Sequence, residues 1–277
     1  MLISPWLKEM LELALKEDTG TGDITTELLI PPQKNAEAGI IAREEGVIAG
    51  LDIAGAVFKL VDNRLNFMQK ISDGEKVEKG SVIAVLSGSA RSILTGERTA
   101  LNFLQRLSGI ATLTAEWVEL IAGYPAQLVD TRKTSPGLRR LEKYAVMTGG
   151  GRNHRMNLSD GVLIKENHIK AAGGIRKAVL RAKEAAPVTL KTEVEVTCPE
   201  EFKEAMEAGA DLIMLDNMDT ETMKKAVELN RGRVLLEASG NITRGRLQEV
   251  AATGVDFISS GALTHSARAL DLSLLIR

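Results

Sequence analysis

The stretch KTEVEVTCPEEFKEAMEAGADLIMLDNMDT, residues 191–220, holds the pattern that decides the fold. Two short apolar runs, TEVEV at 192–196 and DLIMLD at 211–216, enclose a segment at 199–208 with the apolar spacing of an amphipathic helix. A strand, a helix and a second strand in this order predict a βαβ unit with parallel strands.

The same alternation continues on both sides of this stretch. Further apolar runs are QLVDT at 127–131, GVLIK at 161–165, RVLLEAS at 233–239 and VDFISS at 255–260. Segments with helical spacing lie between most of them, at 175–186, 220–230 and 243–252. A series of such units predicts a barrel-like parallel sheet, complete or open.

The first part of the chain has a different pattern of predicted elements. Short strand-like stretches lie within 36–50 and 64–89, and helical spacing follows over 98–121. Ser4 and Pro5 predict a capped helix at the N-terminus. The apolar-rich tail 265–277 could pack back on this first region. We therefore predict an α/β protein with a first domain at 1–108, joined by the tail 265–277, and a catalytic domain at 109–264.

Charge is distributed unevenly. The net charge is −2, but residues 131–170 hold nine Lys or Arg and three Asp or Glu, a local balance of +6. The overall charge and the 3% aromatic content argue against nucleic-acid binding, and the basic stretch predicts a pocket for a small polyanion. No apolar run reaches the roughly 20 residues of a membrane span. The single cysteine, Cys198, suits a reducing cytoplasm.

Polar residues stand at the end of nearly every predicted strand, where parallel barrels carry their catalytic groups. The strands end at Asp130–Lys133, Lys165, Glu195, Asp216–Asn217, Ser239–Gly240–Asn241 and Ser259–Ser260–Gly261. The last two Ser/Gly loops predict a phosphate site. Glu195 and Asp216 suit ribose hydroxyls or Mg²⁺, and Glu193 should point the same way but lie deeper.

The basic residues of this stretch are predicted to have different roles. Arg139, Arg140 and Lys143 belong to a helix-like LRRLEKYAV stretch and are predicted to be surface charge. The run TGGGRNHR at 148–155 predicts a tight loop that carries cations inward. His154 in this run is either a donor to the pocket or a histidine satisfied within its loop.

The stretch DTRKTSPGLRRLEKYAVMTGGGRNHRMNLSDGVLIKENHI at 130–169 resembles the core of the quinolinate phosphoribosyltransferases, also called nicotinate-nucleotide pyrophosphorylases (carboxylating). GDITT at 22–26, GERTALNFLQRLSGIAT at 96–112, EVEV, LDNM, EASGNIT and GVDFISSGALTHSARALDLSL also follow the order of that family. The resemblance implies an N-terminal α/β sandwich, an open parallel α/β barrel and a homodimer, with assembly beyond the dimer left open. It also implies that quinolinate and phosphoribosyl pyrophosphate give nicotinate mononucleotide, pyrophosphate and CO₂, with Mg²⁺, in NAD biosynthesis.

Site residues follow from the resemblance, position by position. It implies a quinolinate pocket made by Arg132, His154 and Arg155, with Arg98 reaching in from the partner subunit. It places Lys133 and Lys165 near the pyrophosphate and the reacting groups, and Glu195 and Asp216 near the ribose and the metal, which they hold directly or through substrate and water. Ser239, Gly240, Asn241, Ser260 and Gly261 fall in the 5′-phosphate loops.

Two departures from the family pattern stand out: KENH where KDNH is common, at Glu166, and ASGN where ASGG is common, at Asn241. The residues by themselves leave three other functions open. They are a related protein associated with molybdenum transport, a barrel aldolase with Lys165 as a Schiff-base nucleophile, and a non-catalytic nucleotide or phosphate sensor.

Overall fold

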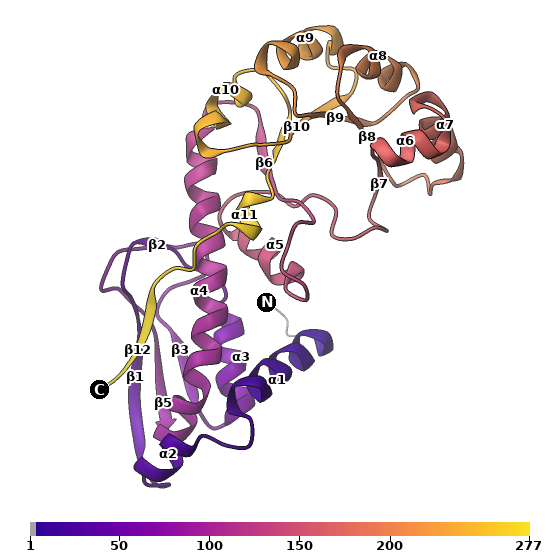
Figure 1. The fold of residues 1–277 in the computed structure, drawn as a ribbon. Helices are drawn as coiled ribbons and strands as arrows, with labels where there is room; N and C mark the ends of the chain where they lie inside the picture. Colours follow the sequence, from indigo (N-terminus) through magenta and orange to yellow (C-terminus); the bar gives the residue numbers. More distant parts are fainter. Residues whose placement is uncertain (1–3) are drawn as a thin grey trace. The chain divides into compact units, whose positions relative to one another are not determined.

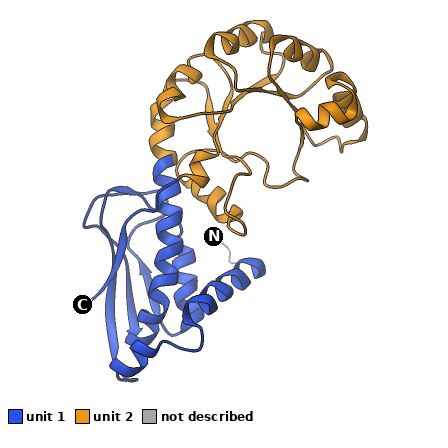
Figure 2. Cartoon of the chain, viewed as in Figure 1, with its two compact units in different colours: residues 1–113, 267–277 blue, residues 114–266 orange. Residues whose placement is uncertain are grey.

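The computed structural model describes residues 4–277. They form two compact units, residues up to 113 together with 267–277, and residues 114–266 (Figure 2). The sequence boundaries at 108/109 and 264/265 differ slightly from these bounds. At the first boundary, the reason is α4 (Ala90–Leu120), an unbroken helix of 31 residues that runs through it.

The first unit is built on a four-stranded antiparallel sheet in the order β12-β1-β5-β3. Its strands are β1 (Asn35–Ala42), β3 (Asn66–Gln69), β5 (Val82–Ser89) and β12 (Leu272–Ile276), and the short β2 (Gly46–Val47) and β4 (Lys76–Val77) pair separately. Its helices are α1 (Pro5–Thr19), α2 (Ile24–Leu29), α3 (Leu51–Val61) and the first part of α4. Because β12 pairs with β1, the C-terminal tail is part of this sheet.

Apolar contacts join the sheet of the first unit to its helices. The ring of Phe58 on α3 stacks on Phe67 of β3 with centroids 5.9 Å apart. Gly55 and Gly96 leave room for these two rings, since a Cβ on either would come within about 3 Å of a ring carbon. Ser4 caps α1, its hydroxyl accepting from the amide of Leu7 at 3.3 Å, as the sequence predicts.

The second unit is a sheet of six parallel strands in the order β6-β11-β10-β9-β8-β7. The strands are β6 (Gln127–Val129), β7 (Val162–Ile164), β8 (Thr192–Val196), β9 (Leu212–Asp216), β10 (Leu235–Ser239) and β11 (Phe257–Ser259). The helices are α5 (Arg139–Thr148), α6 (Glu166–Ala172), α7 (Ile175–Ala185), α8 (Pro199–Glu207), α9 (Thr220–Asn230), α10 (Leu247–Ala251) and α11 (Ala262–His265), with a 3₁₀ turn at Arg244–Arg246.

The sheet of the second unit curves but does not close, because the edge strands β6 and β7 are not hydrogen-bonded to each other. Helices α7 to α10 lie along its outer side (Figure 1). Val194 and Val196 of β8 are fully buried, whereas Glu193 and Glu195 alternate with them and point to the inner side. The predicted open parallel α/β barrel is confirmed.

The predicted helices of this unit are found within a residue or two of their expected bounds, except at 243–252. There the chain forms the 3₁₀ turn and the short α10 in place of one helix. In the first unit, helical structure begins at Ala90, earlier than the predicted Arg98. Among the described residues, no helix has the length and apolarity that crossing a membrane requires.

Candidate active site

A cavity of about 560 Å³ opens at the carboxyl ends of the parallel strands. Most of the residues that the sequence singles out at strand ends meet there. Its lining comprises Thr131, Arg132, Lys133, His154, Arg155, Leu163, Lys165, Glu195, Met214, Asp216, Asn217, Glu237, Ser239, Gly240, Asn241 and Ser259. All of these belong to the second unit.

Cations line the cavity from the two edge strands and one loop. Arg132 and Lys133 follow β6, and Lys165 follows β7, where its Nζ lies 3.2 Å from Glu195 Oε2. The Nε of Arg132 is buried and has no hydrogen-bond acceptor among the described residues. A buried guanidinium donor without an acceptor is costly, so this group is available to an anionic ligand.

The loop at 149–155 carries the remaining cations. Gly151 is required by close packing, because a Cβ there would lie 2.9 Å from side-chain carbons of Thr114 and Val146. Arg155 lines the cavity and donates through Nη1 to the carbonyl of Gly161 at 3.0 Å. Burial, together with the charge of Arg132, lowers the pKa of Arg155. Arg152 is different, since it is exposed and bonds to Gln127.

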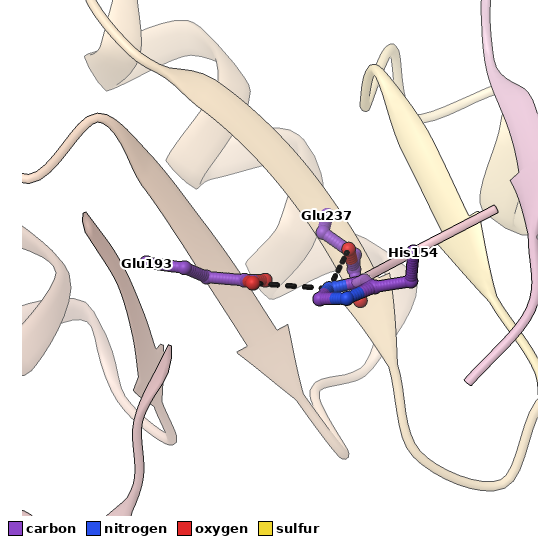
Figure 3. A group of neighbouring side chains, drawn as sticks. All are labelled: His154, Glu193 and Glu237. Atoms are coloured by element: carbon purple, nitrogen blue, oxygen red, sulfur yellow. Dashed lines mark ion pairs between the residues drawn. The ribbon is translucent and has the colours of Figure 1, made fainter. Parts of the chain in front are cut away.

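His154 is held by two buried carboxylates from β8 and β10, the strands on either side of β9 (Figure 3). Its Nε2 lies 3.0 Å from Glu193 Oε2 on β8 and 3.4 Å from Glu237 Oε2 on β10. Its Nδ1 accepts a hydrogen bond of 2.8 Å from the backbone N–H of Arg155. Both ring nitrogens therefore have protein partners, and Glu193 lies deeper than Glu195, as the strand alternation predicts.

His154, Glu193 and Glu237 together bind a proton more tightly than separate groups in water would. Burial alone would lower the pKa of His154, but Glu193 and Glu237 outweigh it and raise the pKa to about 10. Burial, and then the charge of Glu237, raise the pKa of Glu193 against the opposing bond to His154.

The two observations on the ring disagree about where that proton resides. A pKa of about 10 would place protons on both ring nitrogens of His154, whereas the amide of Arg155 needs a lone pair on Nδ1. We assign a neutral ring with Nε2–H toward Glu193, and the extra proton to Glu193, whose pKa burial raises, because a backbone N–H can only donate. The net charge of the trio is −1 in either arrangement.

Lys143 corrects the sequence prediction. It was assigned to the helix surface, but its side chain is fully buried and forms an ion pair with the equally buried Asp130. Its Nζ also donates to the backbone carbonyl of His154 at 2.9 Å. The helical pattern places Lys143 on α5 correctly but does not show that this face of α5 packs against the end of β6. Arg140 on the same helix is exposed, as predicted.

Glu195 and Asp216 are half-buried carboxylates on the adjacent strands β8 and β9. Glu195 lies opposite Met214 in the ladder, and Asp216 is two residues further along the same face. The side-chain amide of Asn217 donates to Asp216 at 2.7 Å. Two hard carboxylates beside open space fit Mg²⁺, which prefers oxygen ligands together with substrate phosphates.

Loops with left-handed backbone form the far side of the cavity. Gly240 (φ 86°), Asn241 (φ 50°) and Asn217 (φ 55°) lie together, and the side-chain Nδ2 of Asn241 donates to Asn217 Oδ1 at 2.9 Å. The departure from ASGG to ASGN is therefore compatible with the turn, since asparagine tolerates positive φ. Glu166, the other departure, is exposed and pairs with Lys170 at the start of α6.

Three predicted residues stand outside the lining. Ser260 is buried, its amide donates to Val129, and the neighbouring Ser259 lines the cavity in its place. Gly261 lies against the wall, where a Cβ would meet Lys133 Cδ at 2.8 Å. Arg98 is exposed on α4 in the first unit.

The charged residue of the lining that sequence reasoning missed is Glu237. It lies within the apolar run RVLLEAS, two residues before Ser239. The signal for Glu237 was the same as for Glu193: a carboxylate inside a strand, on the face of the polar strand end.

Comparisons with known proteins point to one family along almost the whole chain. The models of the quinolinate phosphoribosyl transferase N-terminal and C-terminal domains match residues 23–108 and 110–275. A probable nicotinate-nucleotide pyrophosphorylase [carboxylating] of Synechocystis is 47% identical over 279 residues, covering 100% of this chain and 93% of the relative. The mitochondrial quinolinate phosphoribosyltransferase [decarboxylating] 2 of Nicotiana glauca is 45% identical, covering 98% of this chain and 82% of the relative.

A solved structure extends the likeness to three dimensions. The nicotinate-nucleotide pyrophosphorylase of Francisella tularensis superposes with a TM-score of 0.95 at 47% identity, covering 98% of this chain and 96% of that one. Domain models, full-length relatives and fold all point to one family. The chain belongs to the quinolinate phosphoribosyltransferase family.

Proposed function

We propose that the cavity joins quinolinate to the ribose of phosphoribosyl pyrophosphate and releases pyrophosphate and CO₂, which leaves nicotinate mononucleotide for NAD biosynthesis. The protein would thus act as a pentosyltransferase, a nicotinate-nucleotide pyrophosphorylase (carboxylating). The observation that carries the proposal is the arrangement of the lining: cations from β6, β7 and the glycine loop face carboxylates and a Ser-Gly-Asn turn across one cavity.

The dicarboxylate end is assigned to Arg132 and Arg155. The unpaired Nε of Arg132 and the partly buried guanidinium of Arg155 offer planar donors that match carboxylates. His154 completes the wall, and Arg98 of a second subunit is proposed to reach the same ligand.

The pyrophosphate end is assigned to Lys133 and Lys165. When the glycosidic carbon becomes cation-like, negative charge develops on the leaving pyrophosphate, and two ammonium groups stabilise it. Glu195 and Asp216 would hold the ribose hydroxyls and, with the substrate, Mg²⁺, which supplies further charge neutralisation when bound. Ser239, Gly240 and Asn241 would receive the 5′-phosphate, with Ser260 and Gly261 behind them.

Loss of CO₂ from the 2-carboxylate leaves a carbanion beside the ribosylated, cationic ring nitrogen, and uptake of a proton from water at that carbon gives nicotinate mononucleotide. That cation stabilises the carbanion, so the protein mainly has to place the two substrates and offset their charge. The cation-rich lining suits this task. We propose a homodimer as the active form and the cytoplasm as the location, although the N. glauca relative is named mitochondrial.

Turnover tests the function directly. The purified chain with quinolinate, phosphoribosyl pyrophosphate and Mg²⁺ should form nicotinate mononucleotide, CO₂ and pyrophosphate in equal amounts, measured by chromatography and gas release. Nicotinate in place of quinolinate should give little product, because Arg132 and Arg155 lose one carboxylate partner. Absence of nucleotide at millimolar quinolinate would refute the proposal.

A further inference from the structure

We propose that the buried Lys143–Asp130 pair is a positioning device for the dicarboxylate end of the site. It holds the main chain at His154 and thereby sets where His154 and Arg155 enter the cavity. The inference rests on the proposed function for its readout, but it concerns residues outside the cavity lining.

The contacts converge on one residue of the loop. Asp130, directly after β6, accepts the backbone N–H of His154 at 2.9 Å. Lys143 of α5 donates to the backbone carbonyl of His154 at 2.9 Å and to Asp130. The pair therefore binds the peptide groups on both sides of one α-carbon, and it does so from two different elements.

The neighbouring amide strengthens this arrangement. With its nitrogen turned toward the pair, Asn153 donates to Asp130 Oδ2 at 2.7 Å and to the carbonyl of Lys143 at 2.9 Å. Asp130 then has partners on both carboxylate oxygens. A buried carboxylate satisfied in this way has one preferred geometry, so the loop is held in one position.

A gain in folding stability does not by itself explain why a charged pair, Lys143 and Asp130, is buried here. Both side chains are fully buried, and burial raises the pKa of Asp130 and lowers that of Lys143. Apolar residues of similar volume are often as stabilising as a buried ion pair. In the loop at 149–155, the N–H groups of residues 149–152 have backbone acceptors, whereas the N–H and the carbonyl of His154 bond to side chains. The pair supplies both of these partners at His154.

The side chains beyond the pair depend on this anchor. The ring of His154 reaches Glu193 and Glu237, and Arg155 reaches the carbonyl of Gly161, only if the intervening backbone is in place. A shift of about 1 Å in a positioning group can cost up to about 100-fold in rate. Loss of the anchor should therefore weaken binding of the dicarboxylate more than binding of phosphoribosyl pyrophosphate.

The test separates positioning from stability with two variants. Lys143→Met removes the donor to His154 and leaves the buried Asp130 without its cation, while the N–H groups of His154 and Asn153 still bond to it. The double variant Lys143→Met/Asp130→Asn removes the unpaired charge as well, but it does not restore the donor to His154. Arg140→Met, an exposed change on the same helix, is the matched control. The readouts are kcat, KM for each substrate, and Tm.

We expect Lys143→Met to lower Tm and to raise KM for quinolinate by about tenfold or more, with KM for phosphoribosyl pyrophosphate within about twofold. The double variant should recover most of the lost Tm and keep the raised KM. Recovery of a normal quinolinate KM in the double variant would overturn the proposal. So would failure of both variants to fold, since the pair would then serve global stability. An inactive unmodified protein would instead refute the proposed function, which these variants do not address.

Discussion

Side chains behind the cavity wall determine how the side chains that face the cavity are held. His154 has protein partners at its backbone N–H, its carbonyl and both ring nitrogens. Removing a carboxylate partner should therefore change the protonation of the trio, and removing a backbone partner should change the position of the ring. The residue is over-determined, as groups in a preorganised site are expected to be.

The retained proton predicts a pH dependence of stability. The pKa of His154 is raised to about 10 from 6.5, and whichever member of the trio carries the proton, the folded protein binds more protons than the unfolded chain between these values. This contribution is fully present below pH 6.5 and is lost as the pH rises toward 10. Between pH 7 and 10 it should fall by roughly 2 to 4 kcal/mol.

Urea unfolding from pH 7 to 10 measures this effect in the unmodified protein and in Glu237→Gln. The variant loses one of the two carboxylates that retain the proton, so its free energy of unfolding should depend less on pH. Other titrating groups are common to both proteins and cancel in the comparison. Parallel curves would show that the trio binds no extra proton.

The geometry of Arg155 makes a second prediction at this scale. Arg155→Lys keeps the charge but loses the planar fork, so KM for quinolinate should rise by about tenfold or more while KM for phosphoribosyl pyrophosphate changes little. Arg152→Lys in the same loop is the control, because Arg152 is exposed and bonds to Gln127. Equal effects of the two changes on quinolinate kinetics would contradict the assignment of Arg155.

Sequence reasoning succeeded for single residues where a strand end determined their position. Lys165, Glu195 and Asp216 were predicted to lie at one edge of a parallel sheet, and all three line the cavity. It failed for Lys143, because the spacing of a helix shows which residues share a face but not which partner that face meets. The match of Lys143 to Asp130 is a tertiary contact, and a single sequence carries no signal for it.

At the scale of elements, the turn after β10 shows how backbone conformation makes room for a ligand. Gly240 has φ 86°, and a Cβ there would lie 2.3 Å from Asn217 Oδ1 and 2.8 Å from its backbone nitrogen. Both the left-handed backbone and the close approach of Asn217 therefore require glycine. The Ser/Gly composition predicted a loop here, but not its contact with the turn after β9.

Gly240→Ala should raise KM for phosphoribosyl pyrophosphate by about tenfold or more, because the displaced turn no longer receives the 5′-phosphate. Gly232→Ala is the matched control, since Gly232 also has positive φ (72°) but has open space around it. That control should lose about 1 kcal/mol of stability from backbone strain and keep normal kinetics. Identical kinetic behaviour of the two variants would argue against a phosphate at this turn.

At the scale of the whole molecule, the tail β12 returns to the first sheet, and α4 belongs to both units. The alternation of strand-like and helical segments, together with the apolar tail, predicted the two sheets. The length of α4 was underestimated because its start at Ala90 directly follows β5 without a turn signal. The contribution of Arg98 across a dimer interface stays a prediction.

Mixed dimers test the role of Arg98. If each site combines Lys165 of one chain with Arg98 of the other, equal amounts of Arg98→Ala and Lys165→Ala chains should restore about a quarter of the normal activity by random pairing. Each variant alone should be nearly inactive. Mixtures that stay inactive after confirmed subunit exchange would exclude a shared site.

The most direct test of the central claim is a crystal structure with phthalate, a dicarboxylate that resembles quinolinate. The two carboxylates are predicted to lie against the guanidinium groups of Arg132 and Arg155, with the unpaired Nε of Arg132 among the donors. Phthalate bound instead at the Ser239–Asn241 turn, or outside the cavity, would contradict the assignment of the basic wall to the dicarboxylate.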